Sequence, residues 1–150
     1  MTLDWKEAQK KRVITMSPNM NSVTQELVKW KKPEAGSLKL NVDATVCTCD
    51  DSFSMGLVFR DHAGVFVACK TIRQPPIGTV AEAEALAILE GLHWLLTLPH
   101  YRVFTESDSL TNVRTLQCSQ DNLLEVGHIL DACRIILDSR TGYSISFVKR

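Results

Sequence analysis

The chain has 150 residues, 45% of them hydrophobic, which suits one compact core and is too short for two domains of ordinary size. Seventeen basic residues balance seventeen acidic ones, so the net charge lacks the cationic character of many nucleic-acid binders. A membrane span needs roughly 20 apolar residues, and the longest candidate, residues 85–98, is interrupted by Glu90, Gly91 and His93. We therefore expect a soluble protein.

Cysteine usage points to a reducing compartment. The chain has an odd number of cysteines and no secretory signal precedes them, so we expect an intracellular protein without a disulfide framework, with nucleus and cytoplasm left open. Cys47 and Cys49 are separated by one residue and have no second pair, whereas zinc sites usually have two pairs with at least two residues inside each. Reduced thiols are the better interpretation.

Residues 1–36 are predicted to form an N-terminal arm or linker, with a short helix over residues 4–12, and residues 37–150 to form the domain. The arm ends in the basic patch of residues 29–32, where nucleic-acid contact is one interpretation and a solvated tail is the better one. From Leu38 to Thr45 apolar and polar residues alternate, which predicts a first strand packed on one face. Residues 55–60 and 65–70, joined by a turn over 61–64, predict a hairpin.

Helices dominate the rest of the chain. Residues 79–98 are rich in helix formers and end at Pro99, and a short strand over 101–105 follows. Hydroxyl and carboxylate side chains at 106–109 suit the start of a helix over 110–117. Apolar residues at helical spacing predict another helix over 122–137, and residues 143–149 alternate as a last strand.

Three acidic residues attract attention. Asp43 lies in mid-strand, where Asp has poor propensity, although a position on an exposed face also explains it. Asp108 follows a strand, and taken alone it is better explained as a helix N-cap, a role that Ser107 or Ser109 would fill equally well.

Glu84 shares a helix face with Ala87, Ile88 and Gly91, although a place near the helix start, where the macrodipole favours negative charge, also explains it. Glu82 is the nearby alternative to Glu84 as the acidic residue of interest in this helix. Carboxylates that come close repel one another unless cations neutralise them, and magnesium is the natural partner because it takes carboxylates, waters and phosphate oxygens. If the three side chains meet in space, the sequence predicts a magnesium site.

The segments around these acids carry a resemblance. They are Leu40-Asn41-Val42-Asp43-Ala44, then Ala81-Glu82-Ala83-Glu84-Ala85-Leu86-Ala87 running to Glu90-Gly91-Leu92, and Glu106-Ser107-Asp108-Ser109. In this order they resemble the plant ribonuclease H-like, reverse-transcriptase-like domains, which are similar to type 1 ribonuclease H and to non-LTR retroelement sequences. The likeness covers roughly residues 30–150 and each motif alone is modest.

The resemblance implies an α/β, ribonuclease H-like fold: a mixed five-stranded sheet flanked by helices, with antiparallel first strands and the fourth beside the first. It implies that Asp43, Glu84 and Asp108 are the catalytic residues and bind Mg²⁺, or Mn²⁺, with Glu84 preferred over Glu82 because it places Ala87 and Leu92 in register. The implied activity is endonucleolytic hydrolysis of the RNA strand of RNA/DNA hybrids by a two-metal mechanism. We expect a monomer whose partner is nucleic acid.

Two departures from the family pattern bear on activity. The chain stops at Val148-Lys149-Arg150, so the C-terminal helix and the family's fourth carboxylate are expected to be missing, which predicts weaker metal binding. Leu110 replaces a frequent Gln that contacts nucleic acid in related enzymes, and the four histidines match no proton-shuttling position. Two alternatives follow: a catalytically impaired nucleic-acid-binding remnant of a retroelement domain, or an interaction domain without a nucleic-acid role.

Overall fold

The computed structural model describes residues 32–76, 78–99, 102–118 and 125–149. The predicted helix over 4–12 and most of the basic patch at 29–32 lie outside these residues. The described elements are, in chain order, β1 (Ser37–Cys47), β2 (Ser52–Arg60), β3 (Phe66–Gln74), α2 (Val80–Leu96), β4 (Arg102–Ser107), α3 (Leu110–Gln117), α4 (Glu125–Ser139) and β5 (Tyr143–Phe147).

The strands form one five-stranded sheet in the order β3-β2-β1-β4-β5. β2 is antiparallel to both β1 and β3, whereas β4 is parallel to β1 and to β5. A parallel neighbour requires a crossover, and α2 supplies it between β3 and β4. The predicted mixed sheet, with the fourth strand beside the first, is confirmed.

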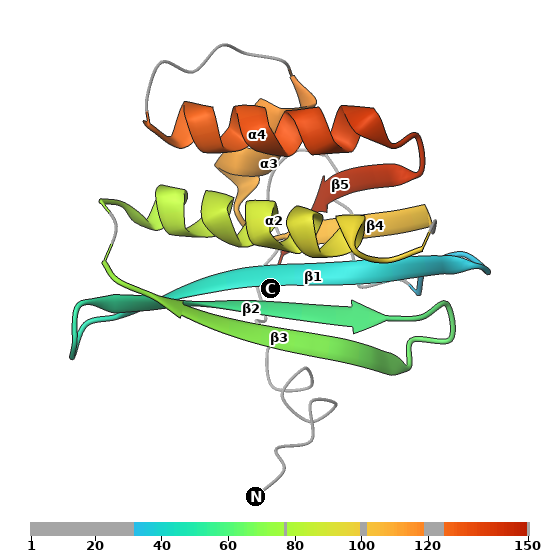
Figure 1. Ribbon diagram of the computed structural model, residues 1–150, viewed down its shortest axis with the longest axis horizontal. Helices are drawn as coiled ribbons and strands as arrows, with labels where there is room; N and C mark the ends of the chain where they lie inside the picture. The colour runs from blue at the N-terminus through green and yellow to red at the C-terminus, as the bar shows by residue number, and fades with distance from the viewer. Residues whose placement is uncertain (1–31, 77, 100–101, 119–124, 150) are drawn as a thin grey trace, which may run out of the picture.

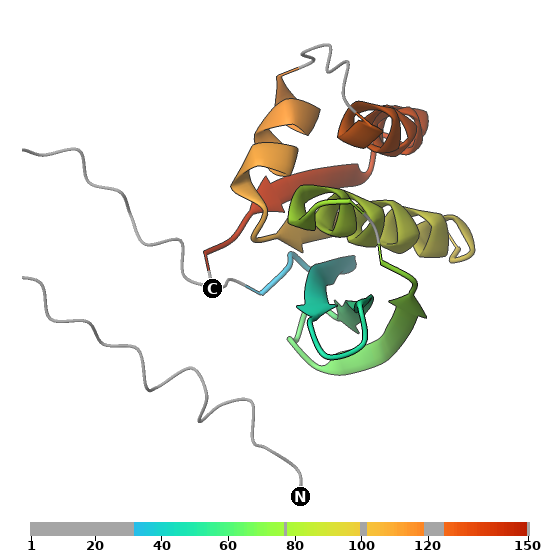
Figure 2. The same cartoon turned by 90° about the vertical axis from the view of Figure 1, so that its left-hand side faces the viewer.

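All three described helices lie on the same face of the sheet, as the edge-on view in Figure 2 shows. α2 packs on β1 and β2, and α4 packs against α2 and also contacts β5, as the placement of the two long helices in Figure 1 shows. Because α2 is covered from two sides, it buries apolar residues around much of its circumference, and not only on the face of Ala87, Ile88 and Gly91 that the sequence indicated. Ala83, Ala85 and Ala87 are all fully buried.

Gly91 sets how closely α2 approaches the sheet. A Cβ atom at this position would lie 2.9 Å from Leu40 Cδ2 and 2.9 Å from Val42 Cγ1, which is closer than real Cβ contacts. The alternate residues Leu40 and Val42 therefore face α2 and the core, and both are fully buried. Their neighbours Lys39, Asn41 and Asp43 belong to the opposite face of the strand.

The hairpin strands are longer than predicted. β1 continues to Cys47 because its pairing with β2 continues through Val46 opposite Phe53 and Cys47 opposite Ser52. The turn between β2 and β3 is closed as predicted: the Asp61 backbone N–H donates to the Val65 carbonyl at 3.0 Å, and Gly64 has a φ of 78°. Among the residues that the structure describes, no helix has the length and apolar character needed to cross a membrane.

Candidate metal centre

Three carboxylates from distant parts of the chain come together at one place. Asp43, Glu84 and Asp108 each offer one oxygen, these oxygens all lie within 4.8 Å of one another, and each residue is half-buried. They come from β1, from the first turns of α2 and from the connection after β4. The structure therefore brings together the three residues that the sequence singled out, while their binding of a metal stays a prediction.

Asp43 lies beside open space. Its partner across the β1–β2 ladder is Gly56, and residues directly opposite in an antiparallel pair share a face of the sheet. A Cβ atom on Gly56 would have no neighbour within 4 Å. The carboxylate is consequently not enclosed on the side of β2.

Glu82 and Glu84 have different tasks at the start of α2. Thr79 is the N-cap, and a capping box joins it to Glu82: the Thr79 N–H donates to Glu82 Oε2 at 2.8 Å, and the Glu82 N–H donates to Thr79 Oγ1 at 3.2 Å. Glu84, two residues later, lies in the carboxylate cluster. Glu82 therefore caps the helix, and of the two glutamates that the sequence offered for the cluster it is Glu84 that lies there.

Asp108 does not cap a helix. The N-cap of α3 is Ser109, and no side-chain capping bond forms there. The connection is ordered instead by Ser107, whose Oγ accepts the Ser109 N–H at 3.1 Å and whose carbonyl accepts the Val148 N–H at 3.0 Å. The capping explanation of Asp108 is wrong, and its carboxylate contributes to the cluster.

Asn112, which the sequence did not single out, links the elements that carry two of the acids. Its side chain is 2% exposed, and its Nδ2 donates to the Ala81 carbonyl at 2.9 Å. This bond joins the first turn of α3, just after Asp108, to the first turn of α2, just before Glu84. The sequence offered one indication that Asn112 has a specific role: Asn is a poor helix former, yet it stands here in a helix next to the core residue Val113.

A buried ion pair lies on the same face of the sheet as Asp43. Lys39 Nζ donates to Glu106 Oε1 at 2.6 Å, and Asn41 Nδ2 donates to Glu106 Oε2 at 2.9 Å. Lys39 is 4% exposed and Glu106 is 8% exposed. Alternation in β1 correctly separated polar from apolar residues, but it did not predict that the polar Lys39 is buried. Because both carboxylate oxygens of Glu106 accept hydrogen bonds from Lys39 and Asn41, this acid has a structural role.

The other residues noted in the sequence lie at the surface. Leu110, two residues after Asp108, is 38% exposed at the start of α3. His62, His93 and His128 are exposed, and His100 lies outside the described residues. None of the three described histidines belongs to the carboxylate cluster.

The sequence from residue 41 to 150 matches the family described as reverse transcriptase-like. Among solved structures, RNase H1 from Halobacterium salinarum is similar over 77% of this chain and 87% of its own, with 19% identity and a TM-score of 0.68. LC11-RNase H1 in complex with an RNA/DNA hybrid is similar over 76% of this chain and 86% of its own, with 17% identity and a TM-score of 0.65.

A third similar structure is the N-terminal RNase H domain of a Mycobacterium tuberculosis protein, which matches 77% of this chain and 84% of its own, with 16% identity and a TM-score of 0.62. No curated protein matches the chain. At these identities the solved structures establish the fold, and the sequence match establishes the family. The chain belongs to the reverse transcriptase-like family and has the RNase H-like fold.

Proposed function

We propose that this protein is a metal-dependent endonuclease that hydrolyses the RNA strand of an RNA/DNA hybrid, with Asp43, Glu84 and Asp108 as metal ligands. One observation carries the proposal: the three carboxylate oxygens lie within 4.8 Å of one another although they come from three separate elements. Like charges at that spacing are stabilised by a cation between them. The RNase H-like fold adds support from an independent direction.

The donor set fits a hard divalent cation. Mg²⁺ binds oxygen ligands at about 2.0–2.1 Å in octahedral geometry, so two ligand oxygens on one ion lie roughly 3–4 Å apart. A cluster within 4.8 Å accommodates one such ion, or two ions about 4 Å apart that share a carboxylate. Mn²⁺ accepts the same oxygen ligands.

The roles of the three residues follow from two-metal hydrolysis. When bound, the cations supply an activated water and stabilise the leaving 3′ oxygen. Asp43, at the centre of the sheet, would bridge the two positions, and Glu84 and Asp108 would each hold one. Gly56 leaves room beside Asp43, and a scissile phosphate needs such room to approach.

An RNA/DNA hybrid is the substrate that fits this fold best. LC11-RNase H1, with which this chain shares the fold, was solved in complex with an RNA/DNA hybrid. A protein distinguishes a hybrid from DNA through the shape of the minor groove and the 2′-hydroxyl groups of the RNA strand. Hydrolysis should therefore be confined to the RNA strand.

The test is cleavage of a hybrid labelled on its RNA strand, with Mg²⁺ and with excess chelator, by the full chain and two variants. Asp43→Asn removes a proposed ligand at nearly constant volume and should lower the rate by at least about 100-fold, because metal stabilisation of the transition state amounts to several kcal/mol. Glu82→Gln is the matched control, since Gln also completes a capping box.

Three results would count against the proposal. Equal rates for Asp43→Asn and the unaltered chain would show that Asp43 is not part of the active site. Cleavage in excess chelator would show that the reaction does not need a metal. Salt-sensitive binding of the hybrid without cleavage would favour the impaired binding remnant instead. The Glu82→Gln variant should cleave at nearly the unaltered rate.

A further inference from the structure

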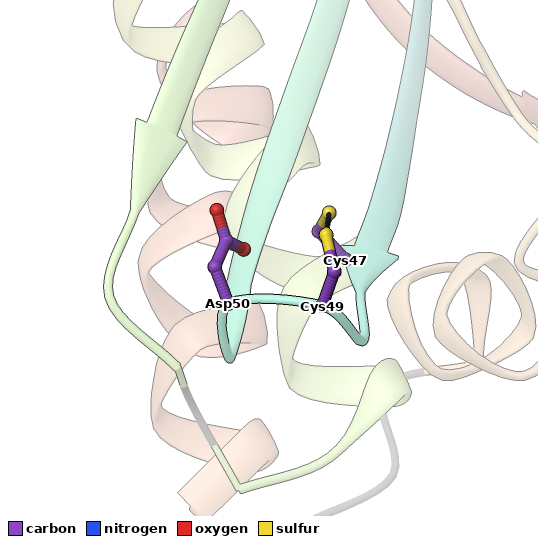
Figure 3. A group of neighbouring side chains, drawn as sticks. All are labelled: Cys47, Cys49 and Asp50. Carbon is purple, nitrogen blue, oxygen red and sulfur yellow. Dashed lines mark hydrogen bonds between the residues drawn. The ribbon is translucent and has the colours of Figure 1, made fainter.

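Two thiols meet at the turn between β1 and β2. Cys47 ends β1 and Cys49 lies in the turn, and their Sγ atoms are 3.0 Å apart. Figure 3 shows the two sulfur atoms next to each other at the end of β1. A disulfide bond is about 2.05 Å long, so the sulfurs need to approach by only about 1 Å to form one.

Asp50 is near enough to suggest a metal site, but its carboxylate is already engaged. One of its oxygens lies within 4.8 Å of both sulfurs. However, Asp50 Oδ1 accepts a hydrogen bond from Ser52 Oγ at 2.7 Å, and Oδ2 forms an ion pair with Arg73 of β3. Two thiols alone fall short of the three or four protein ligands of a zinc site.

The two thiols differ in accessibility. Cys49 is exposed, whereas Cys47 is half-buried and lines a cavity of about 230 Å³ together with Phe53 and Pro76. An exposed thiol is reached first by a reagent from solution, and the more sheltered neighbour is then in place to attack the product. This asymmetry assigns separate roles to the two cysteines.

We propose that Cys47 and Cys49 form a redox-active dithiol that closes reversibly to a disulfide by exchange with a small disulfide of the glutathione class. The Cys49 thiolate attacks the small disulfide, one reduced thiol leaves with the proton, and a mixed disulfide remains on Cys49. The Cys47 thiolate then attacks Cys49 Sγ, which forms the Cys47–Cys49 bond and releases the second thiol. The protein loses two electrons and two protons, and the small disulfide gains them.

Such a disulfide should be readily reduced. It would close a ring across a single intervening residue, Thr48, while β1 stays paired to β2 through Cys47 and Ser52. Strained or exposed disulfides have more oxidising potentials than structural ones and therefore exchange easily. The pair should thus respond to the ratio of oxidised to reduced small thiol.

Two of the three remaining cysteines, Cys69 and Cys133, provide internal controls. Cys69 is exposed and is not one of the two grouped thiols, so it should form only a mixed disulfide. Cys133 is buried, and burial raises its pKa to about 12, so this thiol should stay unreactive in the folded protein.

The test is redox equilibration of the full chain with reduced and oxidised glutathione, followed by acid quench, alkylation, tryptic digestion and mass spectrometry. Trypsin cuts after Lys39 and Arg60, so Cys47 and Cys49 fall in one peptide, whereas Cys69 falls in the next, residues 61–70. As the buffer becomes more oxidising, the first peptide should change from a doubly alkylated form to an unalkylated form. The mass of this form is two hydrogen atoms below that of the reduced, unalkylated peptide. The peptide of Cys69 should carry glutathione or an alkyl group.

Two variants separate the roles. Cys47→Ser should accumulate glutathione on Cys49, because the second thiol is missing, and Cys49→Ser should react more slowly at Cys47. Failure of the unaltered chain to form the internal disulfide at any glutathione ratio overturns the proposal. Calorimetric binding of one Zn²⁺ that is lost in Cys47→Ser, without internal disulfide formation, overturns it in favour of a metal site. Circular dichroism confirms that each variant is folded.

Discussion

The carboxylate cluster and the dithiol pair are both groups of reactive atoms within 4.8 Å, but they arise in different ways. The carboxylates come from residues 43, 84 and 108, so they meet only when β1, α2 and β4 are packed together. Cys47 and Cys49 are brought together by one turn between two paired strands. The carboxylate cluster should therefore depend on distant packing contacts to which the thiol pair is insensitive.

The strongest way to break the packing is to remove the positive charge of Lys39. Lys39→Met would leave Glu106 buried without its cationic partner, and breaking a buried pair in this way costs about 3–5 kcal/mol of the free energy of unfolding. Urea unfolding followed by circular dichroism measures the loss. Lys70→Met, at an exposed position of β3, is the control and should change little. A Lys39→Met loss below about 1 kcal/mol would show that the pair contributes little.

Gly91 tests the spacing between α2 and the sheet. Gly91→Ala introduces a Cβ atom 2.9 Å from Leu40 and Val42 and should lower the free energy of unfolding by about 1–3 kcal/mol, as overpacked cores do. Gly56→Ala adds the same methyl group where nothing lies within 4 Å and should stay within about 0.5 kcal/mol of the unaltered chain. Equal effects of the two substitutions would contradict the packing described here.

Asn112 tests how the carboxylates are positioned. Asn112→Ala leaves the Ala81 carbonyl without its side-chain donor and should lower the free energy of unfolding by about 1–3 kcal/mol. If the bond also aligns Asp108 with Glu84, the Mg²⁺ concentration for half-maximal cleavage should rise while the rate at saturating Mg²⁺ is retained. Thr111→Ala, at an exposed neighbour, is the control. An unchanged Mg²⁺ requirement in a folded Asn112→Ala variant would leave Asn112 with a purely structural role.

The smallest effect is expected at the N-cap of α2. Thr79→Ala removes one half of the capping box and should lower the free energy of unfolding by about 1 kcal/mol. Because the box engages Glu82 and not Glu84, the Mg²⁺ requirement for cleavage should not change. A shift in that requirement would mean that the cap also sets the position of Glu84.

The family resemblance predicted the fourth strand beside the first and the residues of the carboxylate cluster, although each motif that carries it is modest alone. Alternation defined β1, helix formers defined α2, and the three motifs carried the family resemblance. The sequence did not predict the burial of Lys39, since alternation assigns a residue to a face but not the partner that lies there. The bond from Asn112 to Ala81 joins residues 31 positions apart, and no periodic pattern records it.

The proximity of the two thiols could not be predicted from the sequence either. Spacing alone separated Cys47 and Cys49 from common zinc motifs, but it left them as two ordinary thiols. Their approach to 3.0 Å occurs in the turn that joins β1 to β2, in which Asp51 has a φ of 48°. The geometry of that turn is a property of the folded chain, and the residue types in the turn permit several geometries.

The most direct test of the central claim is the thermal unfolding midpoint as a function of Mg²⁺ concentration, since an ion that binds only the folded state raises it. We predict that Mg²⁺ raises the midpoint of the unaltered chain and of Glu82→Gln, and that the rise is abolished or greatly reduced in Asp43→Asn, Glu84→Gln and Asp108→Asn. An equal rise in all five proteins would contradict the account, because Mg²⁺ would then be bound elsewhere.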